Sequence, residues 1–211
     1  LAVDLHNRAA RSSDYLFAAE LSITAQPVTE GGNLDGTTHP WIRRDMPSEK
    51  DWILQTDLEL LNIQFGEFMA GLIIELEEEG SRSRYAFGYK DGKELAVVKV
   101  TSSGSAGTVH ATPFSYSDDV VIRIRRSANQ LFFEYSVESG IWNQAHSLSI
   151  NDNWVAIDGG VFASTEEAKA LRVAFDYLLL SSPEGISPIS DDIVISEIMY
   201  NPPEGSNYEF I

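Results

Sequence analysis

The stretch VVIRIRRSANQLFFEYSVESGIW, residues 120–142, decides the fold of this chain. It holds two runs of alternating apolar and polar side chains, separated by a short polar turn. Successive side chains of a β-strand point to opposite faces, so each run has one apolar face. The pattern predicts an antiparallel hairpin that covers a core with that face. Its other face carries Arg123, Arg125 and Glu134 and is left to solvent or to a ligand.

The same alternation recurs along most of the chain. Residues 51–62 (DWILQTDLELLN) and 68–79 (FMAGLIIELEEE) predict two further strands, and the pair Asp91-Gly92 predicts a tight hairpin turn. Short strands about ten residues apart, with turn residues between them, are typical of β-sandwiches. We therefore predict an all-β fold, an antiparallel two-sheet β-sandwich of the jelly-roll type.

The composition argues against several classes of function. Of the 211 residues, 43% are hydrophobic, which is ordinary for a folded domain. The formal net charge of −17 opposes binding to nucleic acid or to an anionic membrane surface. It is compatible with neutral sugars or cations, or it only keeps the protein soluble. The sequence has no cysteine for disulfides or thiolate zinc sites, and no apolar run near the roughly 20 residues of a membrane span.

An ordered set of short motifs resembles a known group of domains. The motifs are FMAGLII (68–74), YAFGY (85–89), IRIRR (122–126), FFEYS (132–136), GIW (140–142), GGVFAS (159–164) and VAFDYL (173–178). Their order and spacing resemble the concanavalin A-like, laminin-G-like sandwich domains of bacterial secreted proteins. The closest resemblance is to the C-terminal sandwich of β-xylosidases and to the "regulation of enolase" type domains.

The end of the chain resembles a second family. The motif IVISEIMYNP (193–202), followed by YEFI (208–211), is similar to the first strand of bacterial lamin-tail domains. We expect a lead-in at 1–20, the sandwich at 21–181, a Pro/Ser-rich linker at 182–192 and a truncated lamin-tail start at 193–211. The resemblance implies a secreted or cell-surface bacterial protein, cut from a longer polypeptide whose other domains are its partners.

Three glutamates at the end of the second predicted strand are candidates for catalysis. Glu75, Glu77 and Glu79 would share one face at steps of about 6.6–6.8 Å. Carboxylates roughly 5–9.5 Å apart suit glycosidic hydrolysis. The spacing resembles the acidic strand of laminarinase-type hydrolases, but those have aspartate where this chain has Glu77. The other interpretation is a solvated strand end that discourages edge pairing.

The polar face of the sheet allows two interpretations. Opposite charges facing each other across strands stabilise a sheet by about 0.2–1 kcal/mol a pair, which is a sufficient structural explanation. Alternatively, guanidinium and carboxylate groups on this face hydrogen-bond glycan hydroxyls. If the strands share a sheet, the ladder would contain Gln55, Asp57, Glu59, Glu75, Glu77, Arg123, Arg125, Glu134, Arg172 and Asp176.

Sugar binding also needs flat aromatic surface. Trp142 and Trp154 each follow a turn-like segment, and Trp41 lies in a short predicted strand. Tyr85 and Tyr89 are further candidates. The alternative for each ring is packing inside the sandwich or across its end.

Calcium is the cofactor that we consider. Sandwich domains of this type often hold a structural calcium ion with carboxylates and backbone carbonyls. Asp35, in a turn-like NLDG segment, and Asp176, in the last predicted strand, are the candidate ligands. The alternative is a turn cap and a surface carboxylate.

Together these patterns favour a non-catalytic carbohydrate-binding module, not an enzyme, whose partner is a polysaccharide or glycan. The ligand would contact Arg123, Arg125, Glu134, Glu75 and the five aromatic residues named above. Two alternatives stay open. One is a structural or adhesion module that binds protein, and the other is a glycoside hydrolase that uses Glu75 with Glu77 or Glu79.

Overall fold

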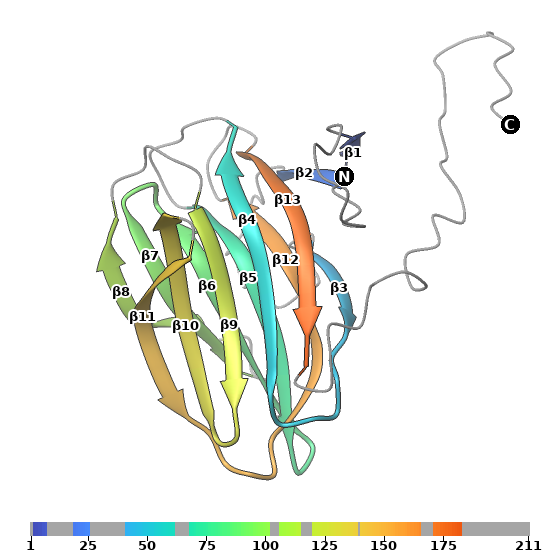
Figure 1. Ribbon diagram of the computed structural model, residues 1–211, viewed down its shortest axis with the longest axis vertical. Helices are drawn as coiled ribbons and strands as arrows, with labels where there is room; N and C mark the ends of the chain where they lie inside the picture. Colours follow the sequence, from blue (N-terminus) through green and yellow to red (C-terminus); the bar gives the residue numbers. More distant parts are fainter. Residues whose placement is uncertain are drawn as a thin grey trace, which may run out of the picture.

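A computed structural model describes most of the sandwich (Figure 1). The backbone is described for residues 2–7 and 19–25, and backbone and side chains for nearly all of 41–61, 68–101, 106–114, 120–138, 140–165 and 171–182. The expected calcium ligand Asp35, almost all of the linker and the lamin-tail segment lie outside these residues. The domain boundaries and the lamin-tail resemblance therefore stay predictions.

The described strands form two antiparallel sheets, which confirms the predicted all-β sandwich (Figure 1). Sheet A has the order β1 (Ala2–Asn7), β2 (Ala19–Ala25), β13 (Leu171–Ser181), β4 (Trp52–Leu60), β9 (Val120–Ser127), β10 (Gln130–Glu138) and β11 (Ile141–Ser149). Sheet B has the order β3 (Trp41–Asp45), β12 (Val155–Thr165), β5 (Phe68–Glu78), β6 (Ser81–Lys90), β7 (Glu94–Thr101) and β8 (Ala106–Pro113). Because β1 pairs with β2, sheet A extends into the segment expected to be a lead-in.

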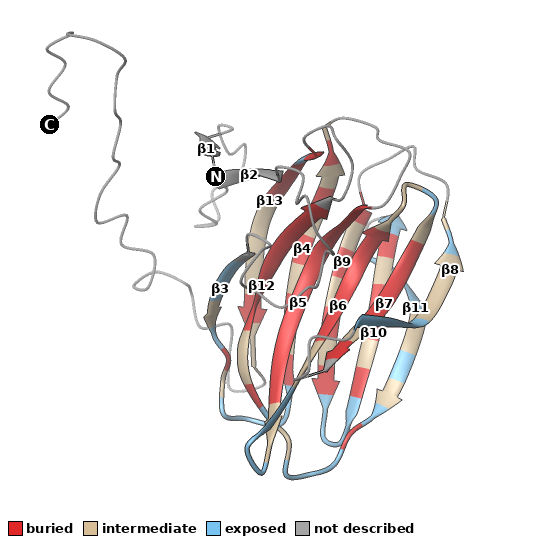
Figure 2. Cartoon of the chain, turned by 180° about the vertical axis from the view of Figure 1, so that it is seen from behind, coloured by how far each residue is buried: buried red, intermediate tan, exposed pale blue. Residues whose placement is uncertain are grey.

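The predicted hairpin is β9 and β10. Ile124 faces Phe133 across it, and Arg123 faces Glu134 one residue further. Burial alternates along β9 with a period of two, as it does along β4 (Figure 2). The apolar side chains of both strands therefore enter the core, and the charged face predicted for the hairpin lies on the outside of sheet A.

The core fills the space between the sheets. Its largest fully buried side chains include Trp52, Phe87, Tyr89, Phe133 and Phe175. The β6–β7 turn forms where Asp91-Gly92 predicts it, with positive φ at both residues.

Sheet B is also apolar on its outer face. Met69, Ile73 and Phe162 belong to a second buried cluster, which contains no described residue of sheet A. This explains why residues 68–74 read as a nearly unbroken apolar run, since a strand buried on both faces needs no alternation.

The last two strands in the sequence pair between strands that precede them in the chain. β12 lies between β3 and β5, and β13 lies between β2 and β4. Glu75 and Glu77 on β5 consequently belong to sheet B, whereas Arg123 and Glu134 belong to sheet A. The predicted single ladder of ten polar residues is wrong, because its members are divided between two sheets.

Candidate functional site

A row of polar side chains crosses five neighbouring strands on the outer face of sheet A. Gln55 is in register with Arg123, Arg123 with Glu134, and Glu134 with Gln144. Tyr177 on β13 adds the fifth member, because its hydroxyl accepts a hydrogen bond of 2.6 Å from Gln55 Nε2. Neighbouring strands are about 4.8 Å apart, so this polar row is about 19 Å long.

Glu134 is the centre of the row. Arg123 Nε donates to its Oε2 at 2.7 Å, and Arg125 donates to both of its oxygens at 3.2 Å. The Glu134 side chain is 9% exposed, against 17% for Arg123 and 29% for Arg125. The cross-strand pairing predicted for these three residues is confirmed.

The environment of Glu134 lowers its pKa. Burial alone acts in the opposite direction and would raise the pKa of a carboxyl group. The hydrogen bonds and positive charges of Arg125 and Arg123 outweigh that effect. Glu134 is therefore a carboxylate at neutral pH and holds two guanidinium groups in fixed positions.

Each arginine also stacks on an aromatic ring. The guanidinium carbon of Arg123 lies 3.7 Å from the ring centre of Trp142, and that of Arg125 lies 4.0 Å from that of Phe132. Such contacts hold the planar fork of an arginine in one orientation. The sequence predicted Trp142 as a site residue. It missed Phe132, although the alternation with Phe133 already places Phe132 on the outer face.

Tyr177 and Gln55 form the other end of the row. The register of β13 shifts between Phe175 and Leu178, so the simple alternation is interrupted there. The backbone carbonyl of Tyr177 accepts a bond of 2.5 Å from the Thr56 hydroxyl. Burial raises the pKa of Tyr177, the Gln55 hydrogen bond lowers it, and nearby Asp57 and Asp176 raise it further. The Tyr177 hydroxyl therefore stays protonated and can donate to a ligand.

The other predicted aromatic residues lie away from this face. Tyr85 and Tyr89 are 3% and 0% exposed and belong to the core, so the prediction that they contact a glycan is wrong. Trp154 packs against the same core and donates its Nε1 hydrogen to Glu78. The backbone of Trp41 opens β3, but its side chain lies outside the described part of the chain.

The acidic strand end is neutralised by arginines. Both oxygens of Glu75 accept hydrogen bonds, one from Arg82 at 3.0 Å and the other from Arg84 at 2.6 Å. Arg82 also binds Glu77 at 3.0 Å. The Glu75 side chain is only 1% exposed. A sugar cannot reach it, so the structure contradicts Glu75 both as a catalytic residue and as a binding residue.

Of the two predicted calcium ligands, Asp35 and Asp176, only Asp176 lies within the described residues. Asp176 lies on β13 next to Tyr177. Within the described residues, no group of three or more His, Asp or Glu side chains is arranged to hold a metal ion. Calcium therefore stays a prediction that rests on resemblance.

Two histidines join the edges of the sheets. His110 on β8 and His146 on β11 stack with ring centres 4.9 Å apart and an angle of 12° between the rings. His146 also stacks on Phe133. Burial and the neighbouring charge of His110 lower the pKa of His146. This pair therefore favours the neutral form of His146.

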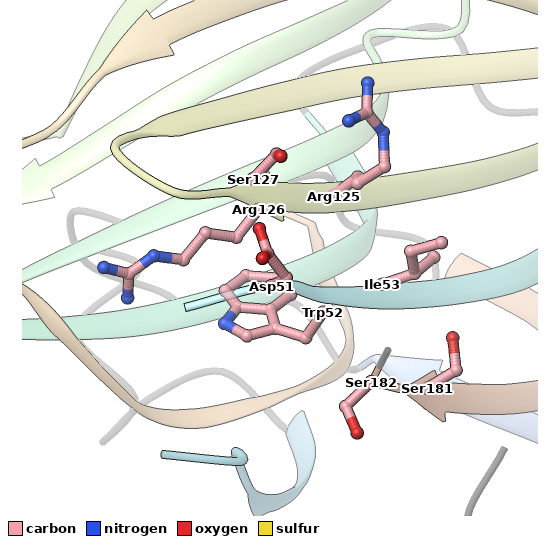
Figure 3. Close-up of a pocket in the computed structure, with 8 residues that line it drawn as sticks. All are labelled: Asp51, Trp52, Ile53, Arg125, Arg126, Ser127, Ser181 and Ser182. Carbon is pink, nitrogen blue, oxygen red and sulfur yellow. The ribbon is translucent and has the colours of Figure 1, made fainter. Parts of the chain in front are cut away.

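A pocket of about 310 Å³ lies where β4 begins and β9 and β13 end (Figure 3). Two nitrogen atoms of residues that line it, Trp52 Nε1 and Arg126 Nη2, are buried without a hydrogen-bond partner among the described residues. Arg126 Nε donates to the carbonyl of Ala128 at 3.1 Å. Burial also lowers the pKa of Arg126, against the raising effect of Asp152 and Asp51. A buried unpaired donor costs about 1–3 kcal/mol of stability.

Comparison with known proteins gives likeness in fold only. No known protein family and no curated protein matches the sequence. A xylan β-1,4-xylosidase from Bacillus halodurans superposes with a TM-score of 0.58 and 13% identity, over 77% of this chain and 33% of its own. A functionally unknown protein from Saccharomyces cerevisiae superposes with a TM-score of 0.54 and 13% identity, over 87% of this chain and 97% of its own. A family 7 alginate lyase superposes with a TM-score of 0.50 and 10% identity, over 83% of this chain and 85% of its own.

These structures support the predicted concanavalin A-like β-sandwich. This chain spans only 33% of the length of the xylosidase that it resembles. No helix among the described residues has the length and hydropathy needed to cross a membrane.

The comparisons also correct one prediction. The sequence favoured a domain that is not an enzyme, but the xylosidase and the alginate lyase that share its fold are enzymes. A sandwich of this kind occurs within catalytic proteins. The fold therefore gives no reason to exclude catalysis, and the prediction of a chain without enzymatic activity is withdrawn.

Proposed function

We propose that this β-sandwich binds polysaccharide across the outer face of sheet A. The observation that carries the proposal is the polar row from Tyr177 to Gln144, which offers hydroxyl, amide and guanidinium groups on five adjacent strands. Such groups hydrogen-bond sugar hydroxyls and fix their orientation. The row is about 19 Å long, which suits an extended chain of several sugar rings.

The aromatic residues of this face support the same ligand. Trp142 and Phe132 lie beside the row, where they hold Arg123 and Arg125 in place and add aromatic surface to this face of the sheet. The named substrates of two similar structures, xylan and alginate, are polysaccharides, which favours this class of ligand over others. On resemblance alone, we further propose that the domain belongs to a secreted or cell-surface bacterial protein with additional domains.

The test is binding to a panel of soluble and insoluble polysaccharides by affinity electrophoresis and pull-down. We expect at least one glycan to bind, and Trp142→Ala to weaken that binding about tenfold or more. Val109→Ala is the matched control, because Val109 is an exposed apolar residue on sheet B. Each mixture is also assayed for chain cleavage, since the fold does not exclude it. Absence of binding to every glycan, with and without calcium, would refute the proposal.

A further inference from the structure

Arg123 of the polar row and Arg125 beside it differ in how many of their N–H donors form hydrogen bonds. Arg125 donates hydrogen bonds from its Nε and one Nη to the two oxygens of Glu134. Arg123 donates only from its Nε, to Glu134 Oε2. A guanidinium group has five N–H donors in a fixed fork. The Nη1 and Nη2 atoms of Arg123 therefore have no hydrogen-bond partner in the described structure.

These free donors are accessible and held in place. The unpaired Nη atoms of Arg123 are not among the buried unpaired atoms of the described residues, so they reach solvent. Trp142 covers the face of the guanidinium at 3.7 Å, and Glu134 fixes its Nε edge. The side chain as a whole is 17% exposed. Little side-chain entropy remains to be lost when a ligand binds to the open edge.

We propose that Arg123 binds the carboxylate of a uronic acid residue in the polysaccharide. This inference rests on the proposed function and names the class of sugar. The Nη1 and Nη2 atoms form a planar edge with parallel N–H bonds, which matches the two oxygens of a carboxylate. Gln55, in register with Arg123, and the Tyr177 hydroxyl lie along the same row and would bind the hydroxyls of the adjacent ring.

The charge of the whole chain does not contradict an acidic ligand. The net charge of −17 acts over distance, whereas the contact with Arg123 is local. At about 0.15 M salt the Debye length is about 8 Å, so the long-range repulsion is largely screened. Arg123 and the neighbouring Arg125 surround the single carboxylate of Glu134, which gives an excess of positive charge at the centre of the row. The acidic residues Asp57 and Asp176 lie towards its Tyr177 end.

The experiment compares each acidic polysaccharide with its own carboxyl-reduced form, in which every carboxylate has become a primary alcohol. The probes are polygalacturonate, alginate and glucuronoxylan at about 0.15 M salt, with neutral xylan and dextran sulfate beside them. We expect at least one uronate polymer to bind and its reduced form to bind about tenfold more weakly or worse. Arg123→Gln should cause a similar loss for the acidic form and little for the reduced form.

Arg43→Gln is the matched control, because it removes the same charge from an exposed arginine of sheet B. Equal binding of the acidic and reduced forms would overturn the inference while the proposed function stands. The same holds if only neutral or only sulfated glycans bind. If no glycan of any kind binds, both proposals fail. The comparison of ligands uses the unaltered protein, so the inference can be refuted even if Arg123→Gln fails to fold.

Discussion

Replacing Glu134 with glutamine should destabilise the sandwich more than a substitution on the outer face of a sheet usually does. The change leaves Arg123 and Arg125 next to each other with one neutral acceptor oxygen in place of a carboxylate. Removing one partner of a fully buried ion pair costs about 3–5 kcal/mol. Glu134 is 9% exposed, but its arginines are 17% and 29% exposed, so water recovers part of that cost. We expect a loss of about 2 kcal/mol.

The measurement is urea unfolding at pH 7, with thermal unfolding as a second readout. For a domain of this size, 1 kcal/mol shifts Tm by about 2–4 °C, so Tm should fall by about 4–8 °C. Glu77→Gln is the matched control. Glu77 is 36% exposed and pairs with an arginine that is 58% exposed, so its loss should cost less than about 1 kcal/mol.

The same variant gives a prediction for pH. The pKa of Glu134 is lowered from its usual 4.5 in the folded protein. The stabilisation that follows from this is complete above pH 4.5 and is lost as the pH falls through the folded-state pKa. The difference between the wild type and Glu134→Gln should therefore be greatest at pH 7 and should shrink below pH 4.5. A difference below about 0.5 kcal/mol at pH 7, or one unchanged at pH 3, would refute the reasoning.

Three further predictions concern stability. Trp52→Phe should leave the free energy of unfolding unchanged or raise it, because it removes a buried indole N–H that has no hydrogen-bond partner in the described structure. A fall in the free energy of unfolding of more than about 3 kcal/mol, which is typical of a cavity, would contradict this. Gly88→Ala should cost about 2–3 kcal/mol in urea unfolding, because its Cβ would lie 2.0 Å from a carbonyl oxygen, whereas Gly107→Ala, with open space around it, should be neutral. The pKa of His146 is lowered from its usual 6.5 in the folded protein, so the stabilisation from neutral His146 is complete above pH 6.5 and declines as the pH falls below it. His146→Asn should flatten the loss of stability between pH 7.5 and 5.5, and an unchanged slope would contradict the role of burial and His110.

The sequence predicts local structure well where one face of a strand is exposed to solvent and the other is buried. The alternation along β4 and β9 gives both the strands and the faces that they bury, since each strand has one apolar side. Asp91-Gly92 gives a turn because its backbone geometry is a local property. The Arg123–Glu134 pair follows from the register of a short hairpin.

Long-range pairing is not visible in the same way. Nothing in the local pattern shows that β5 and β9 lie in different sheets, so Glu75 and Glu134 were expected on one face. The outer apolar cluster of sheet B removes the alternation that would have marked a face. Tyr177 was missed as a site residue because the register shift in β13 interrupts the period of two. Pairing partners depend on tertiary packing, and a strand pattern alone does not specify them.

The insertion of β12 and β13 has a consequence for how the domain is made. The strands β5 to β8 and β9 to β11 form meanders between sequence neighbours, which close small loops and pair quickly. By contrast, β4 must wait for β13, whose Leu180 faces Leu54 from far along the chain. On the ribosome, the edge of β5 would stay unpaired until β12 has emerged, at about residue 165, and the edge of β4 until β13 has emerged, at about residue 181. A nascent chain stalled before that point should be open to proteolysis and to misplaced strand pairing.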